Sequence, residues 1–239
     1  MENFHSASED PKKSSVLFFG RNQCLFSQKA YEHLQHIGFD VTKILSNNRK
    51  ERLLEDIDQW VGEYIICFRS HFILPIHLID RASIAAINFH PAPAEYPGSG
   101  CLNWALYDNA KTYGATAHIM NEKVDNGTII ECRRFPVSPQ DNVTTLLART
   151  HLETFNLFAD ITTGLATDGK NFLNKKIDGS KDERWRGKAR KISEIDQLQI
   201  VNSTFSKQEL ERVIRATHTP SFPLKIHLHG YEFILKLES

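Results

Sequence analysis

Features that would narrow the function at once are scarce in this chain of 239 residues. Its four cysteines, Cys24, Cys67, Cys101 and Cys132, are scattered, with no Cys-x-x-Cys pair. A zinc or iron–sulfur site needs clustered ligands, so we expect no metal, and isolated cysteines indicate free thiols in a reducing compartment. The first apolar run ends at Gly20 and lacks the glycine spacing that cradles the phosphates of a dinucleotide or ATP.

An excess of positive charge is also missing. Lys and Arg number 29, and so do Asp and Glu, whereas a nucleic-acid binder normally has a basic excess. No apolar run approaches the roughly 18–20 residues of a membrane span, and residues 1–15 lack the apolar stretch of a secretory signal. We therefore expect a cytoplasmic protein with no nucleic-acid or membrane partner.

What is present is an alternation of strand and helix patterns. The expected strands cover residues 15–20, 39–45, 64–68, 84–89, 115–121 and 128–137. The expected helices between and after them cover residues 28–36, 48–60 and 142–165. This order predicts an α/β fold with a doubly wound, mostly parallel, Rossmann-like sheet. Ligands of such sheets bind beyond the carboxyl ends of the strands, so functional residues should directly follow Gly20, Phe68 and Phe89.

The C-terminal part has a different composition. Residues 164–186 are rich in Gly, Asn, Lys and Asp, which marks a boundary. Residues 205–217 predict a helix with Ser206 and Glu209 as a capping box, and residues 224–237 predict a β-hairpin around Gly230. We therefore expect a flexible segment at 1–14, a catalytic domain at 15–168 and a small C-terminal subdomain with a terminal hairpin at 169–239.

Asn88 and His90 stand two residues apart at the end of a buried strand. The period of two in a strand puts both side chains on one side of the sheet, and Pro91 and Pro93 stop the strand. An amide N–H can stabilise a developing oxyanion, and an imidazole can exchange protons near neutral pH. This pair predicts a reaction centre at the edge of the sheet.

Asp125 follows 35 residues (125 − 90) after His90, in a turn that contains Gly127. A carboxylate near an imidazole can orient it and raise its pKa. No Ser or Cys nucleophile accompanies these groups, which favours direct transfer without a covalent enzyme intermediate. His118, in a strand-like run, is interpreted as a core residue or a residue that supports the centre.

These blocks resemble a known family in their order and spacing. The matching motifs are Asn88-x-His90, Pro97-Gly98-Ser99-Gly100, Trp104-Ala105, Gly114-x-Thr116-x-His118 and Asp125-x-Gly127. The chain resembles the formyltransferases that use N10-formyltetrahydrofolate as co-substrate. The resemblance implies that Asn88, His90 and Asp125 are catalytic. It also implies a pterin site made by Ser70, Phe72, Ile73, Leu74, Pro75, Asp125 and Gly127.

Within this family, the length of the chain is most similar to the nucleotide-sugar N-formyltransferases. That resemblance implies dTDP-4-amino-4,6-dideoxyglucose or a close relative as substrate, for O-antigen or lipopolysaccharide biosynthesis, and a homodimer formed through the terminal hairpin. An aromatic and basic segment would then bind the nucleotide, with Trp185 stacking on the base. The expected substrate-binding residues are Tyr96, Trp185, Lys188, Arg190, Lys191 and Arg215.

Other functions stay open at this point. The amine could be glycinamide ribonucleotide or methionyl-tRNA, although the enzymes for the latter carry a larger RNA-binding domain. The protein could also be a formyltetrahydrofolate hydrolase, or a non-catalytic module that binds folate or a nucleotide sugar.

Overall fold

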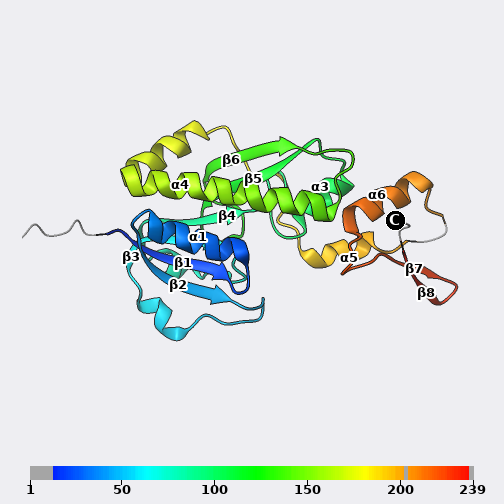
Figure 1. The fold of residues 1–239 in the computed structure, drawn as a ribbon, viewed down its shortest axis with the longest axis horizontal. Coiled ribbons are helices and arrows are strands. Elements are labelled where there is room, and N and C mark those ends of the chain that lie inside the picture. Colours follow the sequence, from blue (N-terminus) through cyan, green and yellow to red (C-terminus); the bar gives the residue numbers. More distant parts are fainter. Residues whose placement is uncertain (1–12, 202–203, 237–239) are drawn as a thin grey trace, which may run out of the picture.

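The computed structural model describes residues 13–201 and 204–236, so most of the expected N-terminal segment lies outside the described residues. Its centre is a six-stranded sheet in the order β2-β1-β3-β4-β5-β6 (Figure 1). Strands β1 to β4 pair in parallel, and β5 is antiparallel to both β4 and β6. The strands are β1 Ser15–Arg21, β2 Asp40–Ser46, β3 Gly62–Phe68, β4 Ala82–His90, β5 Thr112–Ile119 and β6 Ile129–Pro136. The doubly wound, mostly parallel α/β fold is thus confirmed.

Apolar cores cover both faces of the sheet, which explains why the central strands are apolar without alternation. One core packs residues such as Phe18, Phe68 and Phe89 against α1 (Leu25–His36) and α4 (Val143–Gly179). The other packs Phe19 and Cys67 against η1 (Glu55–Gln59) and α2 (Ile76–Ile79). Helices on both faces leave the carboxyl ends of the parallel strands as the open edge of the sheet.

The helix expected over residues 48–60 is wrong, because only the short 3-10 helix η1 forms there. Asn48 Oδ1 accepts a hydrogen bond from Lys50 N at 2.9 Å, and Asn47 is hydrogen bonded to Glu51. Side chains that satisfy nearby backbone groups compete with the helix for those groups. A charged stretch with two asparagines therefore becomes a loop.

Helix α4 is longer than the expected 142–165. Asn142 caps its start by accepting hydrogen bonds from the N–H groups of Thr144 and Thr145. The helix turns at Gly169, where φ is 51°, and then continues to Gly179. The second half brings Leu173 back onto the main core. The expected domain boundary at 168/169 coincides with this turn and stays a prediction.

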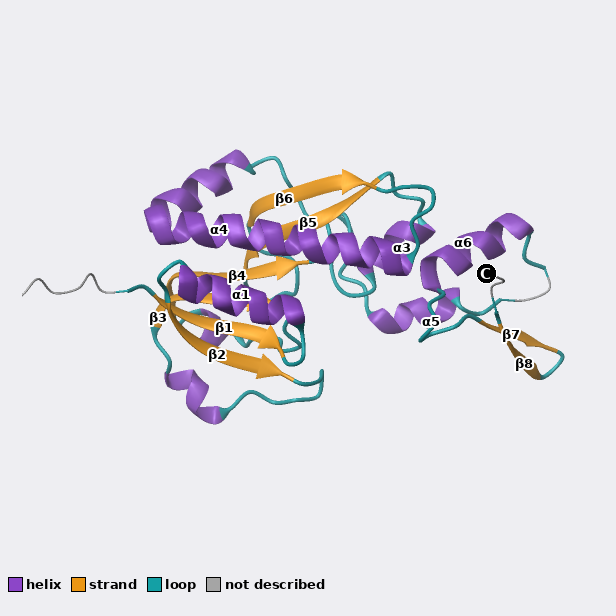
Figure 2. Cartoon of the chain, in the orientation of Figure 1, coloured by secondary structure: helices purple, strands orange, loops and turns teal. Residues whose placement is uncertain are grey.

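The C-terminal residues form a small appendage beside the sheet (Figure 2). It contains the predicted helix with its capping box, in which Ser206 Oγ accepts a hydrogen bond from Glu209 N. It also contains the predicted antiparallel hairpin. The elements of this part are η2 Ile192–Glu194, α5 Ile195–Leu198, α6 Lys207–Thr217, β7 Lys225–Leu228 and β8 Tyr231–Ile234. Helix α3 (Cys101–Tyr107), on the sheet side, packs against α6.

None of the helices in the described part of the chain is both long enough and apolar enough to cross a bilayer. Within residues 13–201 and 204–236, no group of three or more His, Cys, Asp or Glu side chains is placed to hold a metal ion.

Candidate active site

Asn88 and His90 at the end of β4 both reach Asp125 in the turn after β5. His90 Nδ1 lies 3.2 Å from Asp125 Oδ2, and Asn88 Nδ2 lies 3.4 Å from Asp125 Oδ1. β4 and β5 are antiparallel neighbours with Asn88 opposite His118, so the turn after β5 begins beside Asn88. The structure therefore brings together the three side chains that the sequence spacing grouped.

The carboxylate of Asp125 is held in a buried, electropositive place. Only 6% of the residue is exposed, and its φ of +46° shows a left-handed turn conformation. Gly98 N donates a hydrogen bond to Asp125 Oδ2 at 2.9 Å. Burial alone would raise the pKa of Asp125, but the charge of His90, the hydrogen bond of His118 and the Gly98 N–H lower it to about 2. The group is thus a carboxylate anion at neutral pH.

His118 on β5 completes this group of side chains. Its Nε2 lies 3.3 Å from Asp125 Oδ1 and 3.1 Å from Asn88 Nδ2. Its Nδ1 lies 2.9 Å from the carbonyl oxygen of Ile119, and because a carbonyl can only accept, Nδ1 carries a proton. His118 is 2% exposed, so it supports the centre from within the core.

Trp185 lies against this centre rather than on an open surface. Its ring centroid is 5.0 Å from that of His118 and 5.8 Å from that of His90. Its Nε1 donates a hydrogen bond to the carbonyl oxygen of Gly127 at 2.7 Å. A side chain in this position braces both imidazoles and the turn, and the predicted stacking on a nucleotide base stays a prediction.

The loop between β3 and α2 contains the residues expected at the pterin site. Ser70 Oγ accepts a hydrogen bond from Phe72 N at 3.1 Å. Phe72 and Leu74 pack on the core of that face, whereas Ile73 is 76% exposed. Pro75 is the N-cap of α2. The loop thus offers an ordered backbone with one free apolar side chain.

The basic residues expected to bind substrate lie in two places. Lys188 and Arg190 line a cavity of about 70 Å³ together with Tyr96 and Trp104. The Arg190 guanidinium lies 4.2 Å from the centroid of the Trp104 ring, and Arg190 N donates to the carbonyl oxygen of Pro97. Tyr96 also touches the centre, because its carbonyl oxygen lies 2.9 Å from His90 Nε2. Lys191 lies farther along the chain, at the N-cap of η2.

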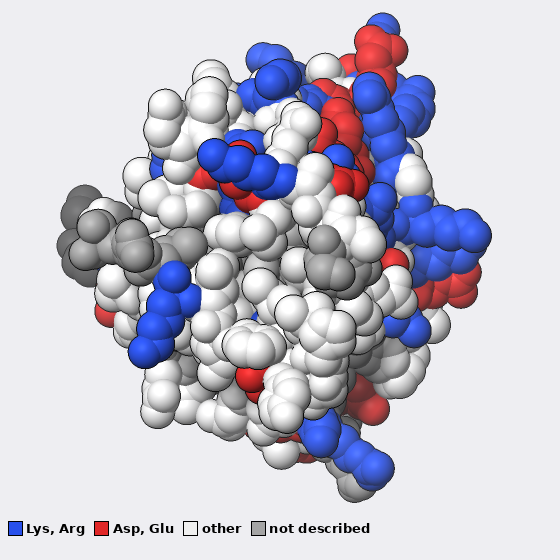
Figure 3. Space-filling model, turned by 90° about the vertical axis from the view of Figure 1, so that its right-hand side faces the viewer, with Lys and Arg blue, Asp and Glu red and all other residues white. Residues whose placement is uncertain are grey.

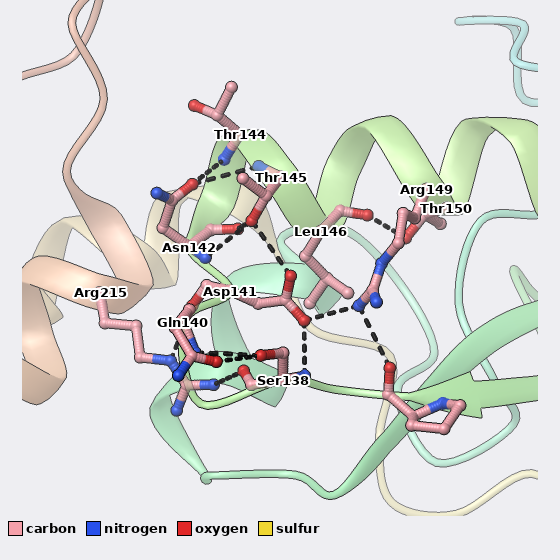
Figure 4. A network of polar contacts seen from close by, with 11 residues as sticks. Ser138, Gln140, Asp141, Asn142, Thr144, Thr145, Leu146, Arg149, Thr150 and Arg215 are labelled. Carbon is pink, nitrogen blue, oxygen red and sulfur yellow. Dashed lines mark hydrogen bonds and ion pairs between the residues drawn. The ribbon is translucent and has the colours of Figure 1, made fainter.

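Arg215, the last of the expected substrate-binding residues, is held by the backbone of the β6–α4 loop (Figure 4). Its Nε donates to the carbonyl oxygen of Asp141 at 2.8 Å and its Nη2 to that of Ser138 at 3.0 Å. Nη1 donates to Asn109 Oδ1 at 3.1 Å. These contacts tie α6 to the sheet, and the structure does not bring Arg215 to the catalytic group.

The sequence spacing did not reveal three features of this region. Gly98 belongs to the Pro97–Gly100 motif that the sequence showed, but the motif did not indicate that the N–H of Gly98 donates a hydrogen bond to Asp125. The packing of Trp185 on the two histidines depends on residues about 60 to 95 positions away in the chain and has no local signal. The third feature is the pair Arg21 and Arg69 at the ends of β1 and β3; topology predicted functional residues at these two positions, but the sequence did not indicate that the two side chains lie together.

Known proteins are similar to this chain at two levels. Residues 16–162, more than half of the chain, match the protein family described as formyl transferase. Over 87 residues the chain is 32% identical to the methionyl-tRNA formyltransferase of Chlorobium chlorochromatii. That stretch covers 36% of this chain and only 27% of the relative, so the chain spans a small part of that protein's length.

The fold is similar to solved structures over nearly its whole length. A sugar N-formyltransferase from a Shewanella species has a TM-score of 0.70 at 19% identity, with 95% of this chain and 98% of that chain covered. The N-formyltransferase of Helicobacter canadensis, in complex with folinic acid and dTDP-3-aminofucose, has a TM-score of 0.66 at 15% identity, with 90% and 84% covered. The match over residues 16–162 confirms the family that the sequence motifs indicated. This chain belongs to the formyl transferase family.

Proposed function

We propose that this protein transfers the formyl group of N10-formyltetrahydrofolate to the amino group of a nucleotide-linked amino sugar. The observation that carries the proposal is the convergence of Asn88 and His90 on the buried, ionised carboxylate of Asp125. An amide donor, an imidazole and a carboxylate at one point suit attack of an amine on an activated acyl carbon. Within the described residues, neither a metal cluster nor a cysteine takes part in this group.

The co-substrate fits the residues beside this group. The loop at 70–75 and the segment after β5 share one apolar floor, since Phe72, Leu74 and Met120 belong to the same core cluster. A flat heterocycle would lie on this floor, between the backbone of the loop and the turn at Asp125 to Gly127. When bound there, N10-formyltetrahydrofolate supplies the formyl group.

The side chains divide the chemistry as follows. Asn88 exchanges its long contact with Asp125 Oδ1, at 3.4 Å, for the formyl oxygen, and donates this N–H where negative charge develops as the amine attacks. Asp125 orients the amine and His90, and an anion suits this task because it accepts hydrogen bonds. The nitrogen of the amine gains a bond to the formyl carbon, and the bond from that carbon to N10 of the folate breaks. The proton that the amine loses passes through the paired Asp125 and His90 side chains to the leaving N10 nitrogen.

For the amine, we favour dTDP-4-amino-4,6-dideoxyglucose or a close relative. The fold likeness to a sugar N-formyltransferase extends over 95% of this chain, and a relative of the same fold was solved with dTDP-3-aminofucose. Methionyl-tRNA is the second candidate, because the relative with 32% identity over 87 residues is named for action on it.

A substrate panel tests the proposal. The chain is incubated with N10-formyltetrahydrofolate and dTDP- or UDP-linked amino sugars, glycinamide ribonucleotide or methionyl-tRNA, and mass spectrometry detects a product heavier by one formyl group. We expect the dTDP-linked amino sugar to be formylated. Asn88→Ala and His90→Ala should each lower the rate on the order of 100-fold or more, as loss of an oxyanion donor does.

His227→Ala, on the exposed hairpin, is the control and should keep the wild-type rate. Wild-type rates in both site variants would reject the mechanism. If only methionyl-tRNA or glycinamide ribonucleotide is formylated, the proposal that the substrate is an amino sugar is rejected. Folate turnover without any amine would identify a hydrolase instead.

A further inference from the structure

Arg134, on the edge strand β6, joins two segments that lie far apart in the sequence (Figure 1 shows the strand). Its Nη1 and Nη2 donate hydrogen bonds to the two carboxylate oxygens of Glu183, at 2.7 and 2.8 Å. Nη2 also donates to Glu95 Oε1 at 2.9 Å. The contact with Glu183 is a bidentate fork, a geometry that fixes direction as well as distance. One guanidinium group therefore attaches both glutamates to the sheet.

This cluster is largely covered by the protein. The exposed fraction of the side chain is 27% for Arg134, 27% for Glu95 and 29% for Glu183. The hydrogen bond from Arg134 lowers the pKa of Glu183, and the same bond raises the pKa of Arg134. A single surface ion pair contributes little to stability, whereas a bidentate arginine in a network holds its partners in place. The cluster is thus suited to fixing positions.

Each glutamate stands close in sequence to a residue that contacts His90. Tyr96 directly follows Glu95, and its carbonyl oxygen lies 2.9 Å from His90 Nε2. Trp185 lies two residues after Glu183, and its ring centroid is 5.8 Å from that of His90. Two of the contacts that surround this imidazole therefore come from segments held by the same guanidinium group.

Main-chain hydrogen bonds join these two segments to each other. Arg186 N donates to the carbonyl oxygen of Ala94 at 2.9 Å, and Ser99 N donates to that of Arg190 at 2.8 Å. Both segments are loops, so neither is fixed by a helix or by the main sheet. Arg134 is the side chain that connects both of them to a strand of that sheet.

The backbone of Arg134 is itself closely fitted. It lies opposite Gly114 on β5, the strand that also carries His118. A Cβ atom at position 114 would lie 1.8 Å from the carbonyl oxygen of Arg133, so only glycine lets the two strands approach as they do. Gly114 belongs to the motif that the sequence showed, and this close approach gives it a physical role.

We propose that Arg134 is a positioning residue for the transfer reaction. This inference rests on the proposed function. Through the two glutamates, Arg134 holds the carbonyl oxygen of Tyr96 and the ring of Trp185 against the imidazole of His90. A displacement of about 1 Å in a catalytic group costs on the order of 100-fold in rate. Loss of the guanidinium group should therefore slow the chemical step and leave the binding of the folate as it is.

The neighbouring Arg133 is a matched control. It also contacts two carboxylates, those of Glu131 and Asp160, and its side chain is 26% exposed. Successive residues of a strand point to opposite faces, so Arg133 faces α4, which carries Asp160, whereas Arg134 faces the two loops. The two arginines share the strand, the exposure and the number of partners, and they differ in what they hold.

Steady-state kinetics with N10-formyltetrahydrofolate and dTDP-4-amino-4,6-dideoxyglucose tests the proposal. We expect Arg134→Met to lower kcat about tenfold with an unchanged KM for the folate. Arg133→Met should keep the wild-type kcat. Arg134→Lys keeps the charge without the fork, so its kcat should lie between those of Arg134→Met and the wild type. Glu183→Gln removes the other half of the fork, should act as Arg134→Met does, and carries the test if Arg134→Met does not fold.

A second measurement needs no substrate. The chain has three tryptophans, so its indole N–H groups give three NMR signals, and Trp185→Phe identifies the signal of Trp185. This N–H donates to the carbonyl oxygen of Gly127 at 2.7 Å and should exchange slowly with solvent. We expect its exchange to be about tenfold faster in Arg134→Met and unchanged in Arg133→Met, because only the first variant releases the loop.

Three results would overturn the proposal: a wild-type kcat in Arg134→Met, an equal loss of kcat in both arginine variants, or unchanged exchange of the Trp185 N–H in Arg134→Met. The outcome is separable from that of the proposed function. If the wild type formylates no amino sugar but exchange at Trp185 rises in Arg134→Met alone, Arg134 holds the site and the proposed function fails. If the sugar is formylated equally fast by the wild type and Arg134→Met, the function stands and the positioning role fails.

Discussion

At the residue scale, Asp125 organises the proposed catalytic group because its two oxygens contact different partners. Oδ2 faces His90 and the N–H of Gly98, whereas Oδ1 faces His118 and Asn88. His90 and His118 each turn their other ring nitrogen to a main-chain carbonyl, that of Tyr96 and that of Ile119. Both rings are therefore fixed at two points, which keeps the amide and the imidazole aligned before substrate arrives.

The low pKa of Asp125 predicts a loss of stability in acid. Its folded pKa of about 2 lies below its ordinary value of 3.8, so between these values the unfolded chain binds more protons than the folded chain. The stabilisation is full above about pH 4 and is lost as the pH falls through 2. It amounts to about 2 kcal/mol for this group.

Urea unfolding followed by fluorescence checks this prediction in the wild type and in Asp125→Asn. The difference in free energy of unfolding between the two proteins should be larger at pH 5 than at pH 2.5. Asp40→Asn, which removes an exposed carboxylate at the start of β2, controls for the loss of one charge. A difference that is the same at both pH values contradicts the assignment.

At the scale of elements, local signals predicted the sheet and missed the longer-range contacts. Buried strands such as 64–68 and 84–89 were predicted because their apolar runs are continuous, and these strands place Asn88 and His90. The prediction of a helix over residues 48–60 was wrong because the Asn48 side chain forms a hydrogen bond with the nearby backbone N–H of Lys50. The extension of α4 beyond Gly169 could not be predicted, since a glycine normally ends a helix and only the packing of Leu173 on a distant core continues it.

The sequence could group the three residues of the proposed catalytic group, but it could not identify the residues that support them. Asn88, His90 and Asp125 carry their signal in type and spacing along the chain. Trp185 and Arg215 instead make their contacts with residues far away in the sequence, and these contacts have no local signal. Their predicted role in binding a nucleotide stays a prediction. The charge or aromatic character of a side chain indicates which groups it is able to bind, whereas the fold determines which residues it contacts.

Arg215 is predicted to fasten α6 to the rest of the molecule. Arg215→Met removes its three hydrogen bonds and leaves the carbonyl groups of Asp141 and Ser138 without this donor (Figure 4). We expect the free energy of unfolding to fall by about 1–3 kcal/mol, as for hydrogen bonds to a charged group. Hydrogen exchange in α6 should also become faster.

Lys207→Met is the matched control, because Lys207 lies at the other end of α6 with a side chain that is 90% exposed. It should unfold at the same urea concentration as the wild type. Equal stability of the two variants would show that Arg215 does not anchor the helix.

At the scale of the whole molecule, the end that carries the C-terminal appendage is unusual in its lack of charge. Figure 3 views the molecule from this end and shows a broad, largely uncharged field with charged side chains of both signs mostly at its margins. Large apolar side chains of the hairpin and its neighbourhood are exposed there, among them Phe222 at 74%, Tyr231 at 70% and Phe233 at 53%. Such a surface on a two-stranded hairpin with a free edge favours association.

This surface supports the predicted homodimer, in which a second copy of the chain would cover the exposed apolar side chains. In the hairpin, Ile226 and Leu235 already pack on the appendage's own core, so the exposed side chains of Tyr231, Phe233 and Ile234 are left for a partner. Light scattering at micromolar concentration should give twice the mass of one chain for the wild type. Phe233→Glu should shift the mass toward one chain, because it would bury an unpaired charge in the interface.

The control is Val61→Glu, which places the same charge on another exposed apolar residue, just before β3 and outside the appendage. This variant should remain a dimer, since it lies at the opposite end of the parallel strands from the catalytic edge. A wild-type mass equal to one chain would exclude the dimer, and loss of the dimer in both variants would move the interface away from the hairpin. A dimer in both variants would likewise show that the hairpin is not its contact.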